Sequence, residues 1–299
     1  MKKIKILTLC LLLSTGLFSQ KKEVKITTIK LTDNIYMLKG QGGNIGISVG
    51  ADGVFMIDDQ YAPLTPKIFA AIKTLTDKSV KFLINTHWHG DHTGGNLNMN
   101  NQGAIIVAQD NVRKRMSVDQ FVRGKKKEAS PKEALPVISF TEDLHFYFND
   151  EAIYIFHVHK AHTDGDAMVY FPKSNVLHMG DVFFQGKYPF IDLDSGGSIN
   201  GVIKAVEMAL LLIDDNTKII PGHQNNSDKK GLLEYYNMLK DIRTAVLKEI
   251  DKGKTLAEVK QNTVLTAKYD TTYGTWFIKP DAFKETVYKS LIAEKENNK

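Results

Sequence analysis

A cluster of three histidines and an aspartate constrains this chain more than any other feature of its sequence. His87, His89, Asp91 and His92 lie within six residues, directly after the apolar run Val80–Asn85. On an extended segment, side chains two residues apart point the same way, so His87 and His89 can share one ion while the following turn directs Asp91 and His92 toward a second. We therefore expect a metal site at the end of a buried strand, where a rigid scaffold positions functional side chains.

Further ligands must come from elsewhere in the chain, and three later segments supply candidates. His162, Asp181 and His223 each stand where an apolar run gives way to a loop rich in glycine or polar residues. Imidazole and carboxylate donors at this density suit Zn²⁺, while Fe, Mn or Co accept the same donors. The pattern predicts a zinc site, with the other metals left open.

Other histidines and aspartates lie close to these candidates in the sequence. His157 and His159 would share a face of the strand that leads to His162, so either is an alternative ligand. Asp164 and Asp166 follow His162, and we expect them to cap backbone N–H groups or to orient the ligand. We expect His178 to pack beside the site and His145 to lie at the surface.

The rest of the chain alternates strand and helix patterns in both halves. Apolar runs bounded by turn signals predict a meander over residues 24–57 and three strands between residues 144 and 177. Helical periodicity covers residues 63–75, 199–212, 228–250 and 281–292, and Thr255-x-x-Glu258 is a capping box. No linker rich in proline, glycine or serine divides residues 21–299. We read them as one α/β domain of two packed sheets with helices on both outer faces.

Residues 1–20 read as a secretory signal peptide. Three lysines precede an apolar run over residues 6–18, which is shorter than a membrane-spanning helix, and Cys10, the only cysteine, lies inside it. We expect a periplasmic or secreted protein with no membrane attachment beyond this signal and no disulfides. Removal of this signal peptide lowers the formal net charge of +5 by three. Because nucleic-acid binding requires clustered positive charge, we expect no nucleic-acid partner.

One basic run interrupts this near-neutral chain. It comprises Arg123, Lys125, Lys126 and Lys127, which we interpret as a solvated loop. Two other features flank the histidine motifs. We expect the glycine-rich loop at residues 42–44 to act as a mobile flap.

We expect some members of an aromatic set to form the wall of an apolar pocket. That set is Trp88, Phe183, Phe184, Tyr188 and Phe190.

The order of these motifs resembles the metallo-β-lactamase superfamily, in which an early Asp, H-x-H-x-D-H, a later His, an Asp or Cys and a final His follow one another. The resemblance implies a four-layer αββα sandwich with two zinc ions at one edge of the sheets. It implies that one ion is held by His87, His89 and His162. It implies that the other is held by Asp91, His92 and His223. Asp181 would bridge the two, and Asp58 would hydrogen-bond to a ligand.

The resemblance also implies hydrolysis of a small molecule by a hydroxide shared between the ions, with Asp91 as the catalytic residue that orients it. Dedicated β-lactamases of the family carry Cys at the position of Asp181 and Lys at that of Phe184. These two departures argue against a dedicated β-lactamase. We expect hydrolysis of a cyclic amide or ester, such as a β-lactam or a lactone, with β-lactam hydrolysis as a main or a side activity. A thioesterase or phosphodiesterase, an iron-dependent oxidative enzyme and a noncatalytic metal protein remain alternatives, and we assign no oligomeric state.

Overall fold

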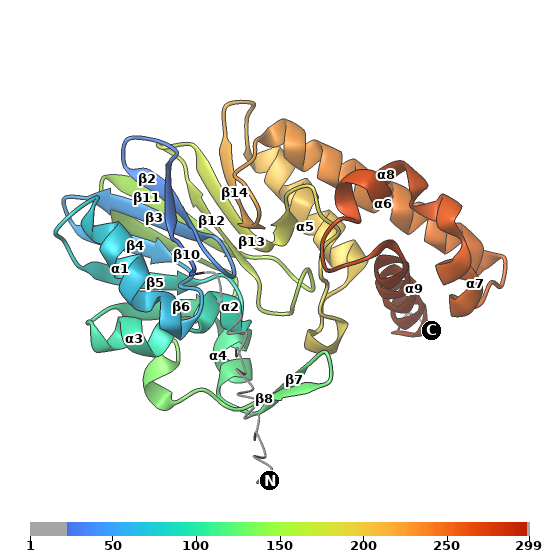
Figure 1. The fold of residues 1–299 in the computed structure, drawn as a ribbon, viewed down its shortest axis with the longest axis horizontal. Helices are drawn as coiled ribbons and strands as arrows, with labels where there is room; N and C mark the ends of the chain where they lie inside the picture. The colour runs from blue at the N-terminus through green and yellow to red at the C-terminus, as the bar shows by residue number, and fades with distance from the viewer. Residues whose placement is uncertain (1–22, 298–299) are drawn as a thin grey trace, which may run out of the picture.

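Two β-sheets packed face to face form the centre of the protein, as its computed structural model shows for residues 23–297 (Figure 1). The segment read as a signal peptide, residues 1–20 with Cys10, lies outside the described residues. Strands in the first sheet follow the order β1-β2-β3-β4-β5-β6-β9 and in the second β10-β11-β12-β13-β14.

The first sheet is built of β1 (Thr27–Lys30), β2 (Ile35–Lys39), β3 (Ile45–Gly50), β4 (Gly53–Ile57), β5 (Val80–Asn85), β6 (Ile105–Gln109) and β9 (Ile138–Phe140). The second is built of β10 (Asp143–Phe148), β11 (Glu151–His157), β12 (Ala167–Phe171), β13 (Val176–Phe184) and β14 (Lys218–His223). A separate hairpin pairs β7 (Gln120–Val122) with β8 (Lys125–Lys127).

Side-chain alternation along the strands separates the layers. In β4, Phe55 and Ile57 join a core shared with Ile155 and Val169 of the second sheet, whereas Val54 and Met56 pack toward helices. Because neighbouring residues of a strand point to opposite faces, one strand serves two hydrophobic layers. The same alternation along the second sheet produces four layers, which confirms the predicted αββα sandwich.

Helices cover both outer faces (Figure 1). The first sheet is covered by α1 (Thr65–Lys73) and α3 (Asn96–Asn101), whose apolar side chains share its outer core. The second is covered by α5 (Ile199–Leu212) and α6 (Lys229–Asp251), and α9 (Pro280–Asn297) packs against these two helices. The remaining helices are α2 (Gly90–Thr93), α4 (Asp110–Met116), α7 (Leu256–Gln261) and α8 (Ala267–Tyr273).

Three expectations differ from the structure. Residues 143–184 form four strands rather than three, because β13 is nine residues long and buried throughout, so it shows no alternation. Helix 63–75 begins as a 3₁₀ turn at Ala62–Leu64. The basic run Arg123 to Lys127 is a β-hairpin rather than a plain solvated loop.

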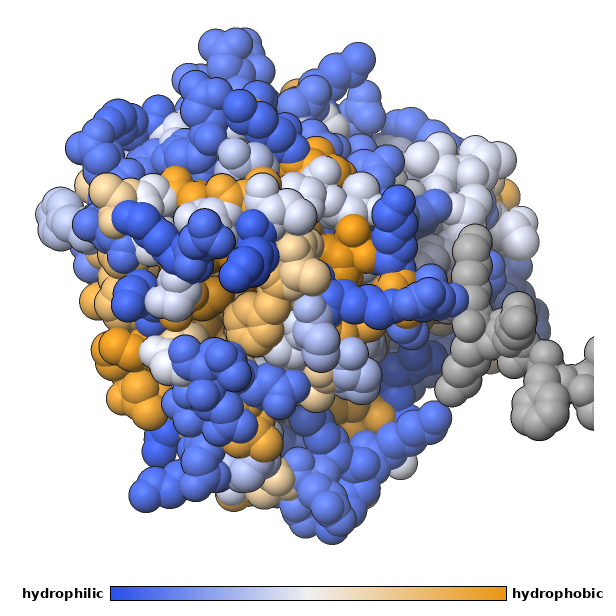
Figure 2. Space-filling view, turned by 60° about the vertical axis from the view of Figure 1, so that its left-hand side comes forward, coloured by the Kyte–Doolittle hydropathy of each residue, from blue (hydrophilic) through white to orange (hydrophobic). Residues whose placement is uncertain are grey.

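The outer surface is mainly polar. On the face drawn in Figure 2, hydrophilic residues cover much of the surface and hydrophobic ones lie between them in small groups. Among the described residues, no helix combines the length and the hydropathy needed to cross a membrane.

Candidate metal centre

Strand ends from both sheets bring all seven predicted ligands together. His87 and His89 follow β5, and Asp91 and His92 lie in the short helix α2. The second sheet supplies the other three side chains. They are His162 in the loop after β11, Asp181 within β13 and His223 at the end of β14. The cluster therefore joins the two halves of the sandwich.

Three buried histidines make up the first donor group. His89 Nδ1 lies 3.1 Å from His87 Nε2 and 2.9 Å from His162 Nε2. A tetrahedral ion with nitrogen ligands at about 2.0 Å separates those nitrogens by about 3.3 Å. The three imidazoles thus already stand at nearly the spacing of ligands to one ion.

The second donor group is Asp91, His92 and His223. Asp91 Oδ2 lies 3.4 Å from His223 Nε2 and 3.7 Å from His92 Nε2. His92 is fully buried, whereas Asp91 is 23% exposed and faces the adjoining pocket. This group is therefore the more accessible of the two.

Asp181 lies between the two groups. Its Oδ2 is 4.0 Å from His87 Nε2 and 3.7 Å from His162 Nε2. Its Oδ1 is 3.1 Å from His92 Nε2 and 3.3 Å from His223 Nε2. One carboxylate oxygen faces each group, which is the arrangement of a bridging ligand.

Unsatisfied polar atoms test whether these residues fit metal ions. Within residues 23–297, His92 Nε2 and Asp181 Oδ1 are buried without a hydrogen-bond partner. Leaving such atoms unpaired is costly, and most buried polar groups have a partner. A divalent ion at the second group would satisfy both atoms, so these residues fit a metal ion; the ligand-like spacing of His87, His89 and His162 makes the same case for the first group.

Hydrogen bonds behind the ligands select the nitrogen that each histidine presents. His92 Nδ1 donates to Asp58 Oδ2 at 2.7 Å, so Nε2 faces Asp181. His89 Nε2 donates to Asp192 Oδ2 at 2.9 Å, which leaves Nδ1 for the first group. His162 Nδ1 donates to the Phe190 carbonyl at 2.7 Å. Such partners fix the tautomer and ring orientation of metal-binding histidines.

Asp58 contacts one of these donors from the end of β4. Besides its bond with His92, it accepts hydrogen bonds from the Thr86 backbone N–H and hydroxyl, both at 2.8 Å. Its backbone has a φ of 60°, an unfavourable conformation for a residue other than glycine. The carboxylate therefore links the end of β4 to the H-x-H-x-D-H segment.

Protonation states suit metal binding at the first donor group. Burial lowers the pKa of His87 and, at His162, lowers it to about 4, so both imidazoles are neutral near pH 7. Burial alone would raise the pKa of Asp91, but His92 and His223 hold it at about 2. Neutral imidazoles and ionised carboxylates are the forms that coordinate metal. In the second group, although burial opposes it, Asp181 raises the pKa of His92 and raises that of His223 to about 9, so an ion bound there would displace a proton from each imidazole.

Two glycines allow close packing around the site. A Cβ at Gly222 would lie 2.0 Å from Asp181 Oδ1, and one at Gly43 would lie 2.2 Å from the His92 ring. The Gly43 N–H also donates to the Asp91 carbonyl at 3.1 Å, and the Asn44 N–H to the Gly222 carbonyl at 2.7 Å. These bonds tie residues 43 and 44 to the segments that carry Asp91 and His223, and a mobile flap at residues 42–44 stays a prediction.

The alternative ligands lie outside the two donor groups. His157 Nδ1 bonds to the Asp166 carbonyl at 2.7 Å, and His159 Nε2 lies 3.1 Å from Glu142, in a separate cavity of about 350 Å³. Asp166 caps the Thr163 N–H at 2.8 Å. The two remaining histidines lie as predicted, His178 buried beside the site and His145 exposed.

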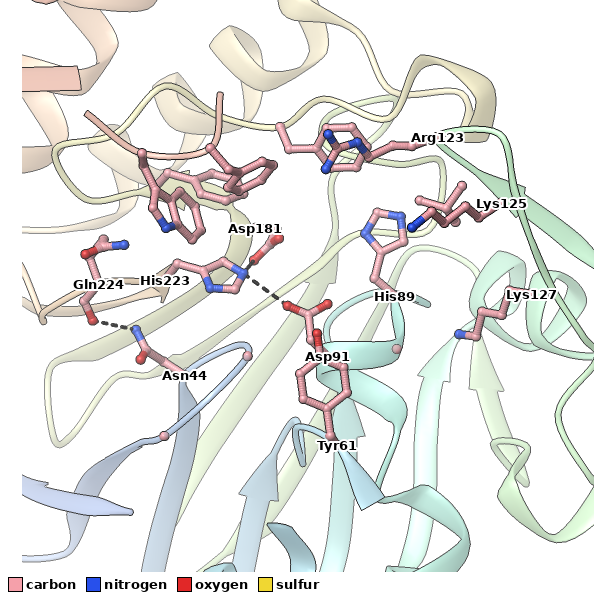
Figure 3. A pocket seen from close by; sticks show the side chains of 18 of the residues that line it. Asn44, Tyr61, His89, Asp91, Arg123, Lys125, Lys127, Asp181, His223 and Gln224 are labelled. Atoms are coloured by element: carbon pink, nitrogen blue, oxygen red, sulfur yellow. Dashed lines mark hydrogen bonds and ion pairs between the residues drawn. The ribbon is translucent and has the colours of Figure 1, made fainter. Parts of the chain in front are cut away.

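A pocket of about 660 Å³ opens over the two donor groups (Figure 3). Phe184 and Phe190 of the predicted aromatic set line it, whereas Trp88, Phe183 and Tyr188 are core residues. Further residues line the pocket, and no local sequence pattern connects them to the histidine motifs. They are Tyr61, the β7–β8 hairpin, Trp276 and Phe277.

The sequence also does not predict the contact between Asp192 and His89. Asp192 lies beyond β13 in a polar segment and contacts His89 only through the tertiary fold. The sequence Asp192-Leu193-Asp194-Ser195 carries a local signal for capping, since Asp192 also accepts from the Ser195 N–H at 3.3 Å. Nothing in that local pattern indicates its contact with a ligand.

Comparison with known proteins agrees with this geometry. The family model of the metallo-beta-lactamase superfamily matches residues 38–223. This segment begins in β2 and ends on the last candidate ligand, His223. It therefore contains all seven donors.

Solved structures with the same fold include two metallo-beta-lactamases. DIM-1 is 18% identical over 73% of this chain and 99% of its own, with a TM-score of 0.59. The enzyme from Pontibacter korlensis is 17% identical over 73% and 100%, with a TM-score of 0.62. A double mutant of the sec-alkyl sulfatase PisA1 is 14% identical over 89% of this chain and 50% of its own, with a TM-score of 0.68.

Proposed function

Because the chain belongs to the metallo-beta-lactamase superfamily, we propose that it is a zinc-dependent hydrolase that cleaves a cyclic amide or ester, such as a β-lactam or a lactone. The observation that carries this proposal is the buried Asp181 carboxylate, with one oxygen toward each donor group. Two ions held there by the seven donors would supply a water that ionises near neutral pH and would polarise the oxygen of the bond under attack.

Asp91 is the protein group best placed to act on the attacking water. It reaches the pocket from α2, and its pKa of about 2 keeps it ionised at neutral pH. An ionised carboxylate accepts a hydrogen bond from the water and orients its lone pair toward the substrate. Asp91 thus combines a ligand position with the catalytic role.

The pocket supports a small-molecule substrate. Its volume of about 660 Å³ is in the range of sites for small ligands, and aromatic side chains form much of its wall. Phe184 belongs to that wall and stacks on His223 with ring centroids 5.4 Å apart. An apolar ring therefore occupies the position at which dedicated β-lactamases carry a lysine, so another part of the pocket must bind any negative charge.

The test is hydrolysis by the zinc-loaded full chain against a chromogenic cephalosporin, an aryl lactone, a thioester and a phosphodiester. We expect turnover of the cephalosporin or the lactone that is lost on chelation and restored by zinc. Turnover of the thioester or phosphodiester alone would replace the substrate class. Oxygen consumption by an iron-loaded protein, without hydrolysis, would overturn the proposal.

We also propose that the protein acts outside the cytoplasm, on the basis of the lysines and apolar run in residues 1–20. Mass spectrometry of the protein from its native host should then give an N-terminus close to residue 21. An intact N-terminus on protein from the cytoplasm would contradict export.

A further inference from the structure

We propose that Arg123 and Lys125 of the β7–β8 hairpin bind a negatively charged group of the substrate, while its apolar body lies on the aromatic wall. The substrate would be an amphiphilic anion, with a carboxylate or a sulfate as the charged group. This inference rests on the proposed function, because it concerns the same pocket. It assigns anion recognition to a segment outside all the metal motifs.

The hairpin projects two cations into the pocket. Arg123 and Gly124 form its turn with φ values of 52° and 74°, the left-handed conformation of a two-residue hairpin loop. Val122 pairs with Lys125, so their side chains share one face. In Figure 3, Arg123 and Lys125 lie beside His89, on the opposite side of the site from Gln224.

The other two lysines of the hairpin have partners. Lys126 forms an ion pair with Asp119 at 2.8 Å. Lys127 donates to the Trp88 carbonyl at 3.0 Å, and its ammonium lies 4.9 Å from the Trp88 ring centroid. By contrast, within residues 23–297 neither Arg123 nor Lys125 has an ion pair or a side-chain hydrogen bond, so both charges are available to a ligand.

The charge of the pocket favours an anion. Its basic lining residues are Lys39, Arg123, Lys125, Lys126 and Lys127, whereas its only acidic ones among the described residues are Asp91 and Asp181. Both carboxylates are assigned to metal ions, so they offer little negative charge to a substrate. A cleft lined by one sign of charge raises the local concentration of oppositely charged ligands.

Aromatic rings stand next to these cations. The Arg123 guanidinium carbon lies 5.6 Å from the Phe277 ring centroid, and Phe277 packs on Trp276 at 4.4 Å. Trp276 lies 5.2 Å from the His223 ring, and Phe190 lies 5.8 Å from the His89 ring. An apolar wall thus extends from the hairpin tip to both donor groups.

Polar contacts fix the hairpin relative to the ligands. Gln120 at its base accepts from Arg115 at 3.2 Å, and Arg115 forms two bonds to Asp164, at 2.6 and 2.8 Å. Asp164 follows His162 by two residues, and Lys127 contacts the residue between His87 and His89. The hairpin is therefore held to both sides of the first donor group.

Binding of non-hydrolysable probes to the zinc-loaded full chain tests this assignment. The probes are 4-phenylbutyrate, a phenylalkyl sulfate of matching length and the neutral 4-phenylbutanamide. Quenching of tryptophan fluorescence reports binding, because Trp276 lines the pocket and Trp88, the only other tryptophan of the chain, is buried beside it. The double variant Arg123→Gln/Lys125→Gln is compared with Lys114→Gln, an exposed lysine of α4 outside the pocket.

We expect the wild-type protein to bind one or both anions more tightly than the amide. The double variant should weaken anion binding about tenfold, change amide binding less than about twofold and retain the full zinc content. Lys114→Gln should change neither. The two anions show whether the site prefers a planar carboxylate or a sulfate.

An anion preference that survives in the double variant would assign the charge to the ions and overturn the proposal. Equal losses for all probes, or no binding of either anion to the wild-type protein, would also overturn it. The binding assay does not depend on turnover, so it separates this proposal from the hydrolase proposal. If only the hydrolase proposal fails, the protein still prefers the anions in the binding assay but hydrolyses none of the substrates in the hydrolysis assay.

Discussion

At the scale of single residues, the site depends on which nitrogen each imidazole presents. Asp58 accepts from His92 Nδ1 and Asp192 from His89 Nε2, so the opposite nitrogens face the cluster. In the first group, His89 Nδ1 lies 3.1 Å from His87 Nε2 and 2.9 Å from His162 Nε2, and lone pairs at this spacing repel unless a cation lies between them. Supporting carboxylates therefore set the affinity for metal although they do not bind it.

Replacing Asp192 tests this dependence. Asp192→Ala should weaken binding of one of the two ions about tenfold to a hundredfold, because His89 loses the partner that fixes its tautomer. Competition with a fluorescent zinc chelator measures the affinity. Asp194→Ala is the matched control, since Asp194 is exposed two residues away. Equal affinities in both variants would contradict the role of Asp192.

His178 should make stability depend on pH. Burial lowers its pKa to about 4 from an ordinary value of 6.5, so between these values the unfolded chain binds a proton that the folded chain does not. Stability must therefore fall as pH falls from 6.5 toward 4. His178→Gln should reduce the loss between pH 7 and pH 4.5 by about 2 kcal/mol.

Urea unfolding of the metal-free protein at the two pH values measures this difference. The control is His145→Gln, the same substitution at an exposed histidine of β10. The same pH dependence in His178→Gln as in the wild-type protein would exclude this histidine as a source of acid sensitivity.

At the scale of elements, local side chains define where several helices begin. Ser198 accepts from the Gly201 N–H at 2.9 Å at the start of α5, and Asp228 from the Gly231 N–H at 2.8 Å at the start of α6. Thr255 and Glu258 form a reciprocal capping box on α7. These bonds satisfy N–H groups that the first helical turn leaves free.

Removing the capping box should destabilise the protein without changing its site. Thr255→Ala should lower the free energy of unfolding by about 1 kcal/mol. Thr286→Ala is the comparison, because its hydroxyl bonds back to the Ala282 carbonyl inside α9, which adds little stability. Denaturant unfolding measures both variants. Equal losses in the two would show that the cap contributes nothing specific.

Such local signals explain which elements the sequence predicts. The strand at Val80–Asn85 and the helix at Ile199–Leu212 are confirmed to the residue. The full length of β13 was not predictable, because His178, Gly180 and Asp181 interrupt its apolar pattern while the fold buries them all. The β7–β8 hairpin was not predicted either, because its run of charged residues is typical of a solvated loop.

For the site, the sequence predicts the candidate ligands but not the residues that line the pocket. Residue type and order identify seven donors that the structure brings together, while their binding of metal stays a prediction. Asp192, Trp276 and the hairpin reach the site through tertiary packing, to which no spacing in the sequence corresponds. Sequence patterns therefore indicate the chemistry of the centre and leave its substrate-facing wall undefined.

At the scale of the whole molecule, the donor groups lie where the two sheets meet. The first sheet supplies Asp58 and the H-x-H-x-D-H segment, and the second supplies Asp181 and His223. Metal ions bound between them would join the two halves of the sandwich. Folding and metal binding should therefore be coupled.

Zinc should accordingly stabilise the fold. Removing metal with a chelator should lower Tm, and returning zinc at a hundredfold excess over Kd should restore about 3 kcal/mol of stability per ion. Differential scanning calorimetry measures both states. In Asp181→Ala, the stability gained on adding zinc should be much smaller. If the Tm of the wild-type protein is the same with and without zinc, the donor groups do not hold metal in the folded state.

We predict that two ions occupy the two donor groups on either side of Asp181. Anomalous diffraction at the zinc absorption edge, from crystals of the zinc-loaded protein, would locate them. We expect two peaks about 3.5 to 4 Å apart, one beside His87, His89 and His162 and the other beside Asp91, His92 and His223. A single peak, or no peak within reach of Asp181, would contradict it.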